Sequence, residues 1–380
     1  MKLNGKNYKR TELLRRVGNM AQLGGISLME YAEGHSRGVR SLDIRTGTGF
    51  QFEVLPDRGF DIGRAEYQGV SLAWLAPKMF PGPWFYESGQ GDPYSFVRTA
   101  LGGLFNTCGL VHLGNQKELP TEHFGYSARM TEVYGIHDRI SMTPADRFNY
   151  GEEWDGERRR LWVSGTVRQE LAYGENLLLS RRYDTEIGSN SFKITDVVRN
   201  DGYNTSPHQI LYHFNIGFPI LDSTSELLCA VAEDVEDLAS SLSNFAKGEA
   251  ESDKFRNYVE PQERFGCEAY GVRMQPDENG MIGVALVNRS LRPERGGVGV
   301  YLRYRASQLP HYIAWRQMAE GLYAVGLEPA TNPFSTPAEL LEKGYQVMLE
   351  PGEERHYELE FGVLEGANAI DTFKASLPKR

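Results

Sequence analysis

A histidine inside an apolar segment is one of two residues whose position favours acid–base chemistry. His213 lies in residues 207–217 (PHQILYHFNIG), whose apolar residues predict a strand. Imidazole titrates close to neutral pH, so this side chain can act as a general acid. A buried histidine satisfied by one neighbour is an equally good interpretation. His208 lies five residues earlier, and because side chains alternate along a strand, we expect it on the opposite face.

Glu328 is the second of these residues. It lies in residues 326–332 (GLEPATN), after an apolar run and directly before a proline that ends the predicted strand. A carboxylate at a strand end under an aromatic rim is desolvated, which raises its pKa toward the working range of a base. The sequence alone favours an exposed carboxylate at the rim. Trp315, upstream of Glu328, is the expected apolar wall.

Two predicted turns carry further polar side chains. His137 precedes Asp138 and Arg139 in residues 135–141 (GIHDRIS), where the three either bind a polar ligand or form a surface ion pair. Arg58 and Asp61 flank a turn in residues 55–63 (LPDRGFDIG), for which a structural salt bridge is the main alternative.

Small residues surround Asn106 in residues 102–110 (GGLFNTCGL), which allows close packing of the backbone. Cys108 in the same segment is expected to be a buried small residue and not a nucleophile. The three cysteines, at positions 108, 229 and 267, are far apart and form no CxxC pair, so a disulfide framework or zinc site is not expected. This cysteine usage favours a reducing, cytoplasmic location.

The sequence contains no motif that would hold a metal or a cofactor. There is no GxGxxG after a strand, no Walker lysine loop, no GxSxG and no HExxH. The glycine pairs at 102–103 and 296–297 are isolated and fit turns better than phosphate cradles. We therefore expect no cofactor and no metal.

The elements that must position these residues are mostly strands. Residues 10–24 show helical spacing, whereas the chain alternates from about residue 26, with a hairpin predicted over 39–54 around Gly47 and Gly49. Residues 76–97 are rich in Pro, Gly and aromatics and predict a long loop that covers a cleft. Residues 223–260 are acidic and Ser-rich and predict a solvated excursion with a helical turn.

These patterns predict an all-β, mainly antiparallel fold: one large twisted β-sandwich with a short N-terminal helix. No composition break marks a boundary, so residues 1–380 are expected to form a single domain with a helical segment at 1–25. The 380 residues are 40% hydrophobic, which supports a packed core, and carry a net charge of -10. Because the chain is acidic, we do not expect it to bind nucleic acid. Because it has no 18-residue apolar window, we do not expect it to span a membrane.

Five segments together resemble a known family. RGFDIG, GGLFNTCGL, IHDRIS, LYHFNIGFP and GLEPATN occur in an order that resembles the uncharacterised branch of the aldose 1-epimerase (galactose mutarotase) superfamily. The resemblance runs from the N-terminal helix to beyond residue 332. It implies a supersandwich fold with a sugar bound in an open cleft, and a small-molecule carbohydrate as partner of a monomer or homodimer.

The resemblance also implies roles for individual residues. His213 would protonate the ring oxygen of the sugar, and Glu328 would take the proton of the anomeric hydroxyl. His137 resembles the second sugar-binding histidine, and either Arg58 or Arg139 would take the place of the sugar-binding arginine. Asn106 and Trp315 complete the expected substrate contacts.

The expected activity is that of a sugar mutarotase acting on an aldose or a modified hexose. The alternatives are a carbohydrate-binding protein without turnover, or another sugar isomerase or lyase on the same scaffold. The sequence does not identify the sugar. An anionic sugar would call for two or more arginines in the cleft, and Arg58, Arg98 and Arg139 are the candidates.

Overall fold

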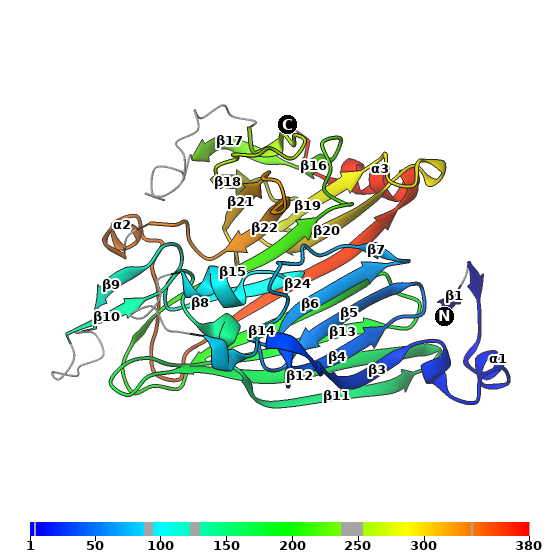
Figure 1. Ribbon diagram of the computed structural model, residues 1–380, viewed down its shortest axis with the longest axis horizontal. Helices are drawn as coiled ribbons and strands as arrows, with labels where there is room; N and C mark the ends of the chain where they lie inside the picture. Colours follow the sequence, from blue (N-terminus) through cyan, green and yellow to red (C-terminus); the bar gives the residue numbers. More distant parts are fainter. Residues whose placement is uncertain (4, 87–93, 122–129, 237–253, 336, 380) are drawn as a thin grey trace.

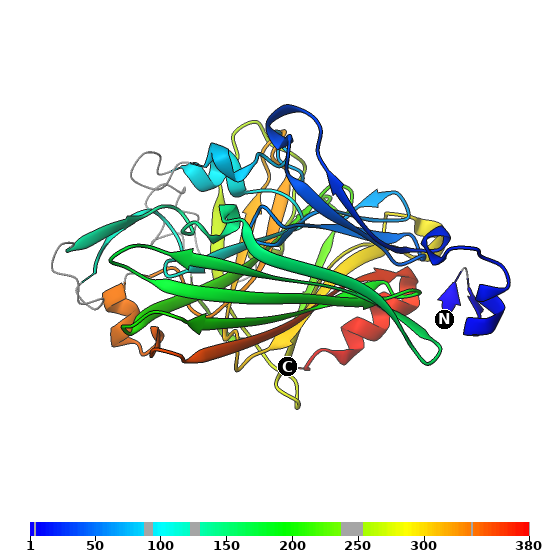
Figure 2. The ribbon, with the colours of Figure 1, turned by 90° about the horizontal axis from the view of Figure 1, so that it is seen from below.

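Two antiparallel β-sheets packed face to face make up most of the protein (Figures 1 and 2). The computed structural model describes residues 1–3, 5–86, 94–121, 130–236, 254–335 and 337–379. The prediction of an all-β, mainly antiparallel sandwich is confirmed.

The first sheet has eight strands, and its central strands alternate between buried and partly exposed residues. In β12, the residues at positions 161, 163, 165 and 167 are buried, whereas those at 162, 164 and 166 are partly exposed. This alternation is typical of a sheet with one face on the core. The strand order is β11 (Ala145–Asp155), β12 (Arg158–Glu170), β13 (Asn176–Glu186), β14 (Ser191–Asn200), β24 (Glu354–Glu365), β20 (Val298–Arg305), β19 (Met281–Asn288) and β16 (Glu226–Cys229).

The second sheet has twelve strands, with β15 at its centre. The path runs β17 (Val231–Glu236), β18 (Glu268–Met274), β21 (His311–Gln317), β22 (Ala324–Ala330), β15 (Ser206–Gly217), β8 (Phe105–Leu110), β6 (Asp61–Tyr67), β5 (Phe50–Leu55), β4 (Arg40–Arg45) and β3 (Gly25–Glu30), with β23 (Val347–Leu349) beside β15 and β7 (Val70–Ser71) beside β6. Nearly every residue of β15 is buried, so both of its faces are covered. This explains why its sequence is a continuous apolar run.

Aromatic rings fill the space between the two sheets. Phe214 of β15 stacks on Phe361 of β24 with ring centroids 5.6 Å apart, and Phe105 of β8 lies 4.9 Å from Phe214. Burial of each ring stabilises the fold by about 1.5–3 kcal/mol. The rings hold the central strand of one sheet against the other sheet.

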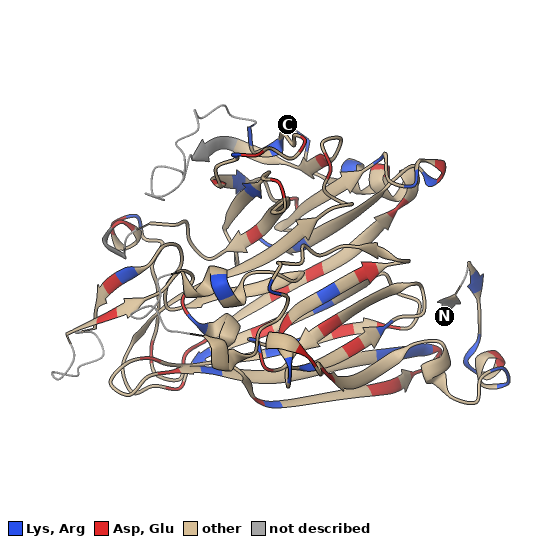
Figure 3. Cartoon of the chain, viewed as in Figure 1, with Lys and Arg blue, Asp and Glu red and all other residues tan. Residues whose placement is uncertain are grey.

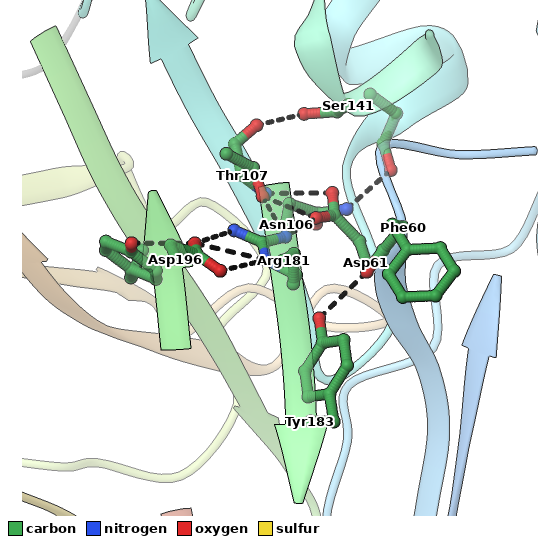
Figure 4. A network of polar contacts seen from close by, with 10 residues as sticks. Phe60, Asp61, Asn106, Thr107, Ser141, Arg181, Tyr183 and Asp196 are labelled. Atoms are coloured by element: carbon green, nitrogen blue, oxygen red, sulfur yellow. Dashed lines mark hydrogen bonds and ion pairs between the residues drawn. The ribbon is translucent and has the colours of Figure 1, made fainter. Parts of the chain in front are cut away.

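A buried ion-pair network also joins the sheets (Figure 4). Arg181 of β13 reaches Asp196 of β14 at 2.6 Å and crosses to Asp61 of β6 at 2.8 Å. Thr107 of β8 donates its backbone N–H to Asp61, and Tyr212 of β15 donates its hydroxyl to Asp196, each at 2.8 Å. The partner of Asp61 is therefore Arg181, and the turn salt bridge considered for Arg58 and Asp61 does not form.

The helices are short and lie at the edges of the sandwich. The helix expected over residues 10–24 is two pieces, α1 (Arg10–Leu14) and a 3-10 turn (Met20–Gln22), because Gly18 and Asn19 interrupt the helical run. The C-terminal helix α3 (Gly366–Ser376) packs Ile370 and Phe373 into an apolar cluster with β19 and β20. The remaining short elements are β1 (Lys2–Leu3), β2 (Lys6–Asn7), β9 (Lys117–Pro120), β10 (Thr131–Tyr134) and α2 (Pro337–Glu342).

The hairpin predicted over residues 39–54 is confirmed, with β4 paired to β5 and positive φ angles at Gly47 and Gly49. The solvated excursion predicted over 223–260 is wrong in its described part, because β16 and β17 pair there with β19 and β18. The helical turn predicted for the same segment is present as a 3-10 turn at Lys254–Arg256. Residues 237–253 of that segment lie outside the described residues.

Charged side chains of both signs are intermixed on the strands that Figure 3 draws. In the described part of the chain, no helix has the length and apolar character needed to span a bilayer.

Candidate active site

A cavity of about 640 Å³ opens on the face of the twelve-stranded sheet that points away from the other sheet. Strands β15, β21 and β22 supply its floor, and segments at residues 74–78, 94–101, 114–115 and 136–137 supply its walls. Residues 76–78, 94, 96 and 97 belong to the loop that was predicted to cover a cleft. Apolar side chains make most of the lining, among them Trp74, Phe96, Leu101, Ile136, Trp315 and Phe334.

Strand register brings His213 and Glu328 together in the floor of this cavity. Leu211 pairs with Ala330 and Phe214 pairs with Leu327 across β15 and β22. This register puts His213 directly across from Glu328, and both side chains line the cavity. His208 does not line it: its ring is buried between the Leu110 carbonyl and the Tyr357 hydroxyl, in agreement with the odd spacing.

The two side chains touch, but neither has a full set of hydrogen bonds. His213 Nε2 lies 3.2 Å from Glu328 Oε1, a contact that is close enough for an ion pair but lacks hydrogen-bond alignment. His213 Nδ1 and Glu328 Oε1 therefore have no hydrogen-bond partner among the described residues. Buried polar atoms without partners are costly, and at a cavity wall they point to a ligand that completes them.

Gly326 makes room for the Glu328 carboxyl. The two residues are two apart on β22 and so share a face of the strand. A Cβ at position 326 would lie 1.9 Å from Glu328 Oε1. No side chain can take that place without displacing the carboxyl, which explains the glycine of the GLEP segment.

Burial keeps both side chains of the pair in their uncharged forms. It lowers the pKa of His213 to about 3, and the nearby polar groups of its own backbone and of Asn215 offset only part of this. Burial also raises the pKa of Glu328 well above its usual value. Near pH 7 the empty site therefore favours a neutral imidazole and a protonated carboxyl. The exposed carboxylate that the sequence alone favours at position 328 is wrong, because Glu328 is 1% exposed.

His137 lies beside this pair with a defined orientation. Its ring centroid is 6.1 Å from that of His213, and Phe96 and Phe334 pack on it at 5.0 and 5.4 Å. Gly114 donates its backbone N–H to His137 Nδ1 at 3.3 Å, which leaves the proton of the neutral ring on Nε2. Burial holds the pKa of His137 well below its usual value, so the ring presents one donor and no charge.

Trp315 forms the aromatic wall over the pair. Its ring lies 5.5 Å from that of His213 and 6.5 Å from that of Trp74, edge-on in both cases. The indole N–H donates to Cys267 Sγ at 2.6 Å, which fixes the orientation of the ring. Aromatic faces of this kind contact the C–H groups of sugars.

Arg58 and Asn106 do not line the cavity but hold one of its walls. The Arg58 guanidinium donates to the Thr99 and Ala100 carbonyls at 3.0 and 2.8 Å. The Asn106 amide donates to the same Ala100 carbonyl at 3.2 Å. Both residues therefore fix the end of the π-helical segment Phe96–Ala100, which supplies Phe96 and Val97 to the wall.

Arg139 also lies away from the cavity lining, in a polar cluster behind His137. It forms an ion pair with Glu175. Gln169 donates to Asp138 at 2.7 Å and to Glu175 at 3.2 Å. This cluster fixes the turn at residues 137 and 138, where both φ angles are positive, at 55° and 62°.

Among the described residues, no group of three or more His, Cys, Asp or Glu side chains could hold a metal ion. What the cavity offers is one histidine–carboxyl pair, a second neutral histidine and aromatic walls.

Comparison with known families gives a match over most of the chain. Residues 36–363 match the family described as a domain of unknown function (DUF4432). The chain belongs to this family. A search of curated proteins finds no match for the chain.

Solved structures similar to this member of DUF4432 share its fold. A protein of Klebsiella pneumoniae subsp. pneumoniae, provisionally described as an aldose 1-epimerase, is 20% identical, with a TM-score of 0.79 over 93% of this chain and 86% of the other. Galactose 1-epimerase from Lactobacillus acidophilus is 12% identical, with a TM-score of 0.56 over 90% and 100% of the chains. A galactose mutarotase-like protein of Clostridium acetobutylicum is 13% identical, with a TM-score of 0.56 over 89% and 98%. The resemblance to the aldose 1-epimerase superfamily is confirmed at the level of the fold.

Sequence reasoning missed several polar residues of the cavity in this DUF4432 member, among them Lys78, Asn115 and Gln317. Gln317 lines it together with Trp315, and their spacing of two on β21 would have shown that they share a face. Lys78 also lines it, from an irregular loop where no periodicity indicates which way a side chain points.

Proposed function

We propose that the protein is an aldose 1-epimerase-like isomerase that interconverts the anomers of an aldose or a modified hexose. The observation that carries this proposal is the contact of His213 with Glu328, at 3.2 Å, in the floor of a cavity large enough for a sugar. One residue of the pair is a proton acceptor and the other a proton donor. Anomer interconversion needs those two functions and no other.

The reaction that this pair would catalyse is the opening of the sugar ring. The acceptor takes the proton of the anomeric hydroxyl O1, and the O1–H electrons form the C1=O1 bond. The C1–O5 bond breaks, and O5 takes the proton of the donor. Rotation about the C1–C2 bond and the reverse transfers then close the ring on the other face of C1.

Adjacent groups suit this chemistry because O1 and O5 are bonded to the same carbon. The contact of His213 with Glu328 leaves no room for a sugar ring between the two side chains. A sugar that enters from the cavity would instead present O1 and O5 to the two groups side by side. The pair then gives one proton to O5 and takes one proton from O1 in the same step.

Burial favours Glu328 as the donor and His213 as the acceptor in the empty site. The neutral pair, with the proton on Glu328, differs from the charged pair of the family mechanism by transfer of that one proton across the contact. A coupled pair of this kind titrates as a unit. The roles of the two residues therefore interchange between ring opening and ring closure, and each turnover ends with both residues in their starting protonation states.

The remaining lining would orient the sugar. His137 Nε2 would donate to a hydroxyl, and Trp315 would pack on the C–H face of the ring. A small-molecule carbohydrate is thus the proposed partner, and a binding protein without turnover is the less favoured alternative because it would not need the acid–base pair. All three cysteines are free thiols, which supports the proposed cytoplasmic location. Whether the protein is a monomer or a homodimer stays a prediction.

The experiment is saturation-transfer NMR at the anomeric protons of a panel of aldoses and acidic sugars. The proposal expects faster exchange between α and β anomers for at least one sugar, at catalytic protein concentration and after treatment with EDTA. Binding without faster exchange across the panel would favour the binding protein. A rate that EDTA abolishes and one metal restores would refute the His213–Glu328 mechanism.

A further inference from the structure

The ammonium group of Lys78 lines the cavity with most of its hydrogen-bonding capacity unused. Lys78 is the one Lys or Arg in the part of the lining that the structure describes. It donates a hydrogen bond to the Leu101 carbonyl, and no described carboxylate pairs with it. Because an ammonium group has three N–H donors, two remain for a ligand.

A second cation lies behind Lys78 and is not neutralised locally. The Arg58 guanidinium donates hydrogen bonds to main-chain carbonyls, which carry no net charge. Asp61 and Tyr31 are the groups that stabilise its charge electrostatically, but Asp61 is bound to Arg181. Burial, and then the charge of Arg58, lower the pKa of Lys78 to about 7. This wall of the cavity therefore lacks an anion.

The floor of the cavity does not repel an anion. Glu328 is the carboxyl group among the described lining residues, and in the empty site it favours its protonated form. Aromatic and aliphatic side chains make up most of the remaining lining and offer no competing charge.

We propose that the cavity takes an aldose that carries a carboxylate, and that Lys78 Nζ pairs with this carboxylate while His213 and Glu328 act at the anomeric carbon. This inference rests on the proposed function and adds the class of substrate. A single ammonium group matches a single negative charge, which favours a carboxylate over the dianion of a phosphate ester. The arginines expected for an anionic sugar are replaced by this lysine, since Arg58 and Arg139 do not line the cavity.

The test compares sugars that differ at one carbon only. Galacturonate and galactose, and glucuronate and glucose, differ by a carboxylate in place of a hydroxymethyl group. Binding is measured by titration calorimetry and anomer exchange by NMR, for the wild type and for Lys78→Met, Lys78→Arg and Lys117→Met. Lys117 is the matched control because it also donates to a main-chain carbonyl, that of Ser335 at 3.1 Å, but lies outside the cavity lining.

We expect the wild type to bind at least one uronate about tenfold or more tighter than its parent hexose. Lys78→Met should remove this preference, Lys78→Arg should keep most of it, and Lys117→Met should leave it unchanged. The preference should also weaken as the pH rises through about 7, where free Lys78 loses its proton.

Three results would overturn the inference. Suppose that the parent hexoses are turned over as fast as the uronates or faster, and that Lys78→Met does not change this. That result would be compatible with the proposed mutarotase activity but would refute the preference for a carboxylate. Tight binding of the hexose 6-phosphates without binding of the uronates would show that the single-charge argument is wrong. If no sugar of either kind bound or exchanged faster, the proposed function would fall together with the inference.

Discussion

His213 and Glu328 contact each other in surroundings that disfavour charge on both. The imidazole has a pKa lowered by burial and the carboxyl has a pKa raised by burial, so their order is the reverse of that in water. The pair holds one proton over the whole interval between the two pKa values. It is therefore ready to donate and accept a proton at any pH in that interval.

The pH profile of the exchange rate should show a broad plateau. The pair gains a second proton only below the lowered pKa of His213, about 3, and loses its one proton only above the raised pKa of Glu328. With a neutral aldose, which avoids the titration of Lys78, kcat/KM should change less than about threefold from about pH 5 up to the alkaline limb that the raised pKa of Glu328 sets. An alkaline limb with a midpoint near 6.5 would instead support the protonated histidine that the family resemblance implied.

Gly326→Ala should slow anomer exchange although it substitutes neither His213 nor Glu328. The added Cβ would lie 1.9 Å from Glu328 Oε1 and must push the carboxyl out of its position opposite His213. The exchange rate should fall about tenfold or more, since misplaced catalytic groups lose orientation. Gly18→Ala is the control, because a Cβ at Gly18 meets nothing within 4 Å. A fully active Gly326→Ala protein would show that the carboxyl position is not needed.

Strand parity was enough to separate His208 from His213, whereas Glu328 was singled out by the family resemblance, because its residue type and position alone favoured an exposed carboxylate. The sequence did not show that His213 and Glu328 would touch, since this depends on the register of β15 against β22, a pairing between segments more than 100 residues apart. Arg58 and Asn106 were predicted to contact the substrate because they are polar and lie in family motifs. In the structure, the side-chain N–H groups of both residues instead donate to main-chain carbonyls of the cavity wall.

At the scale of elements, long alternating strands were predictable and irregular segments were not. Period-two alternation marks β12, β13 and β14, and a continuous apolar run marks the doubly covered β15. The segment Phe96–Ala100 has no such pattern, and its position depends on Arg58, 42 residues before Ala100, and on Asn106 in the following strand. The sequence therefore could not predict which residues form the walls of the cavity, nor that Lys78 is one of them.

Asn106→Ala should loosen this wall. The amide oxygen accepts from the Gly102 N–H and from Asn215 Nδ2, each at 3.1 Å. The variant leaves the Gly102 N–H buried without this partner, whereas Asn215 Nδ2 keeps its hydrogen bond to the Gly103 carbonyl. We expect a loss of about 1–3 kcal/mol in the free energy of unfolding. A positioning role predicts a higher KM with a nearly unchanged kcat. The exposed Asn279→Ala is the control, and a large fall in kcat alone would instead place Asn106 among the catalytic groups.

At the scale of the whole molecule, the Arg181 network ties the two sheets together. Arg181→Met would leave Asp61 and Asp196 buried without their cation. Loss of one partner of a buried ion pair costs about 3–5 kcal/mol in the free energy of unfolding. The next residue, Arg182, is 41% exposed in its side chain, so Arg182→Met should cost less than about 1 kcal/mol.

Urea unfolding followed by fluorescence and by circular dichroism measures both variants. If residues 1–380 form a single domain, as the sequence predicts, the two signals should change together in one transition. Separate transitions would contradict that prediction, and equal losses in the two variants would contradict a tie between the sheets at Arg181.

The central claim, that the His213–Glu328 pair opens the sugar ring, is tested most directly by Glu328→Gln. The change keeps the shape of the side chain and removes its exchangeable acid, and the exposed Glu320→Gln serves as the matched control. We measure anomer exchange by NMR on the best sugar of the panel, together with its affinity. The account predicts a fall in exchange rate of at least about a hundredfold with the sugar still bound and the control fully active. A Glu328→Gln protein that exchanges anomers within about twofold of the wild-type rate would contradict it.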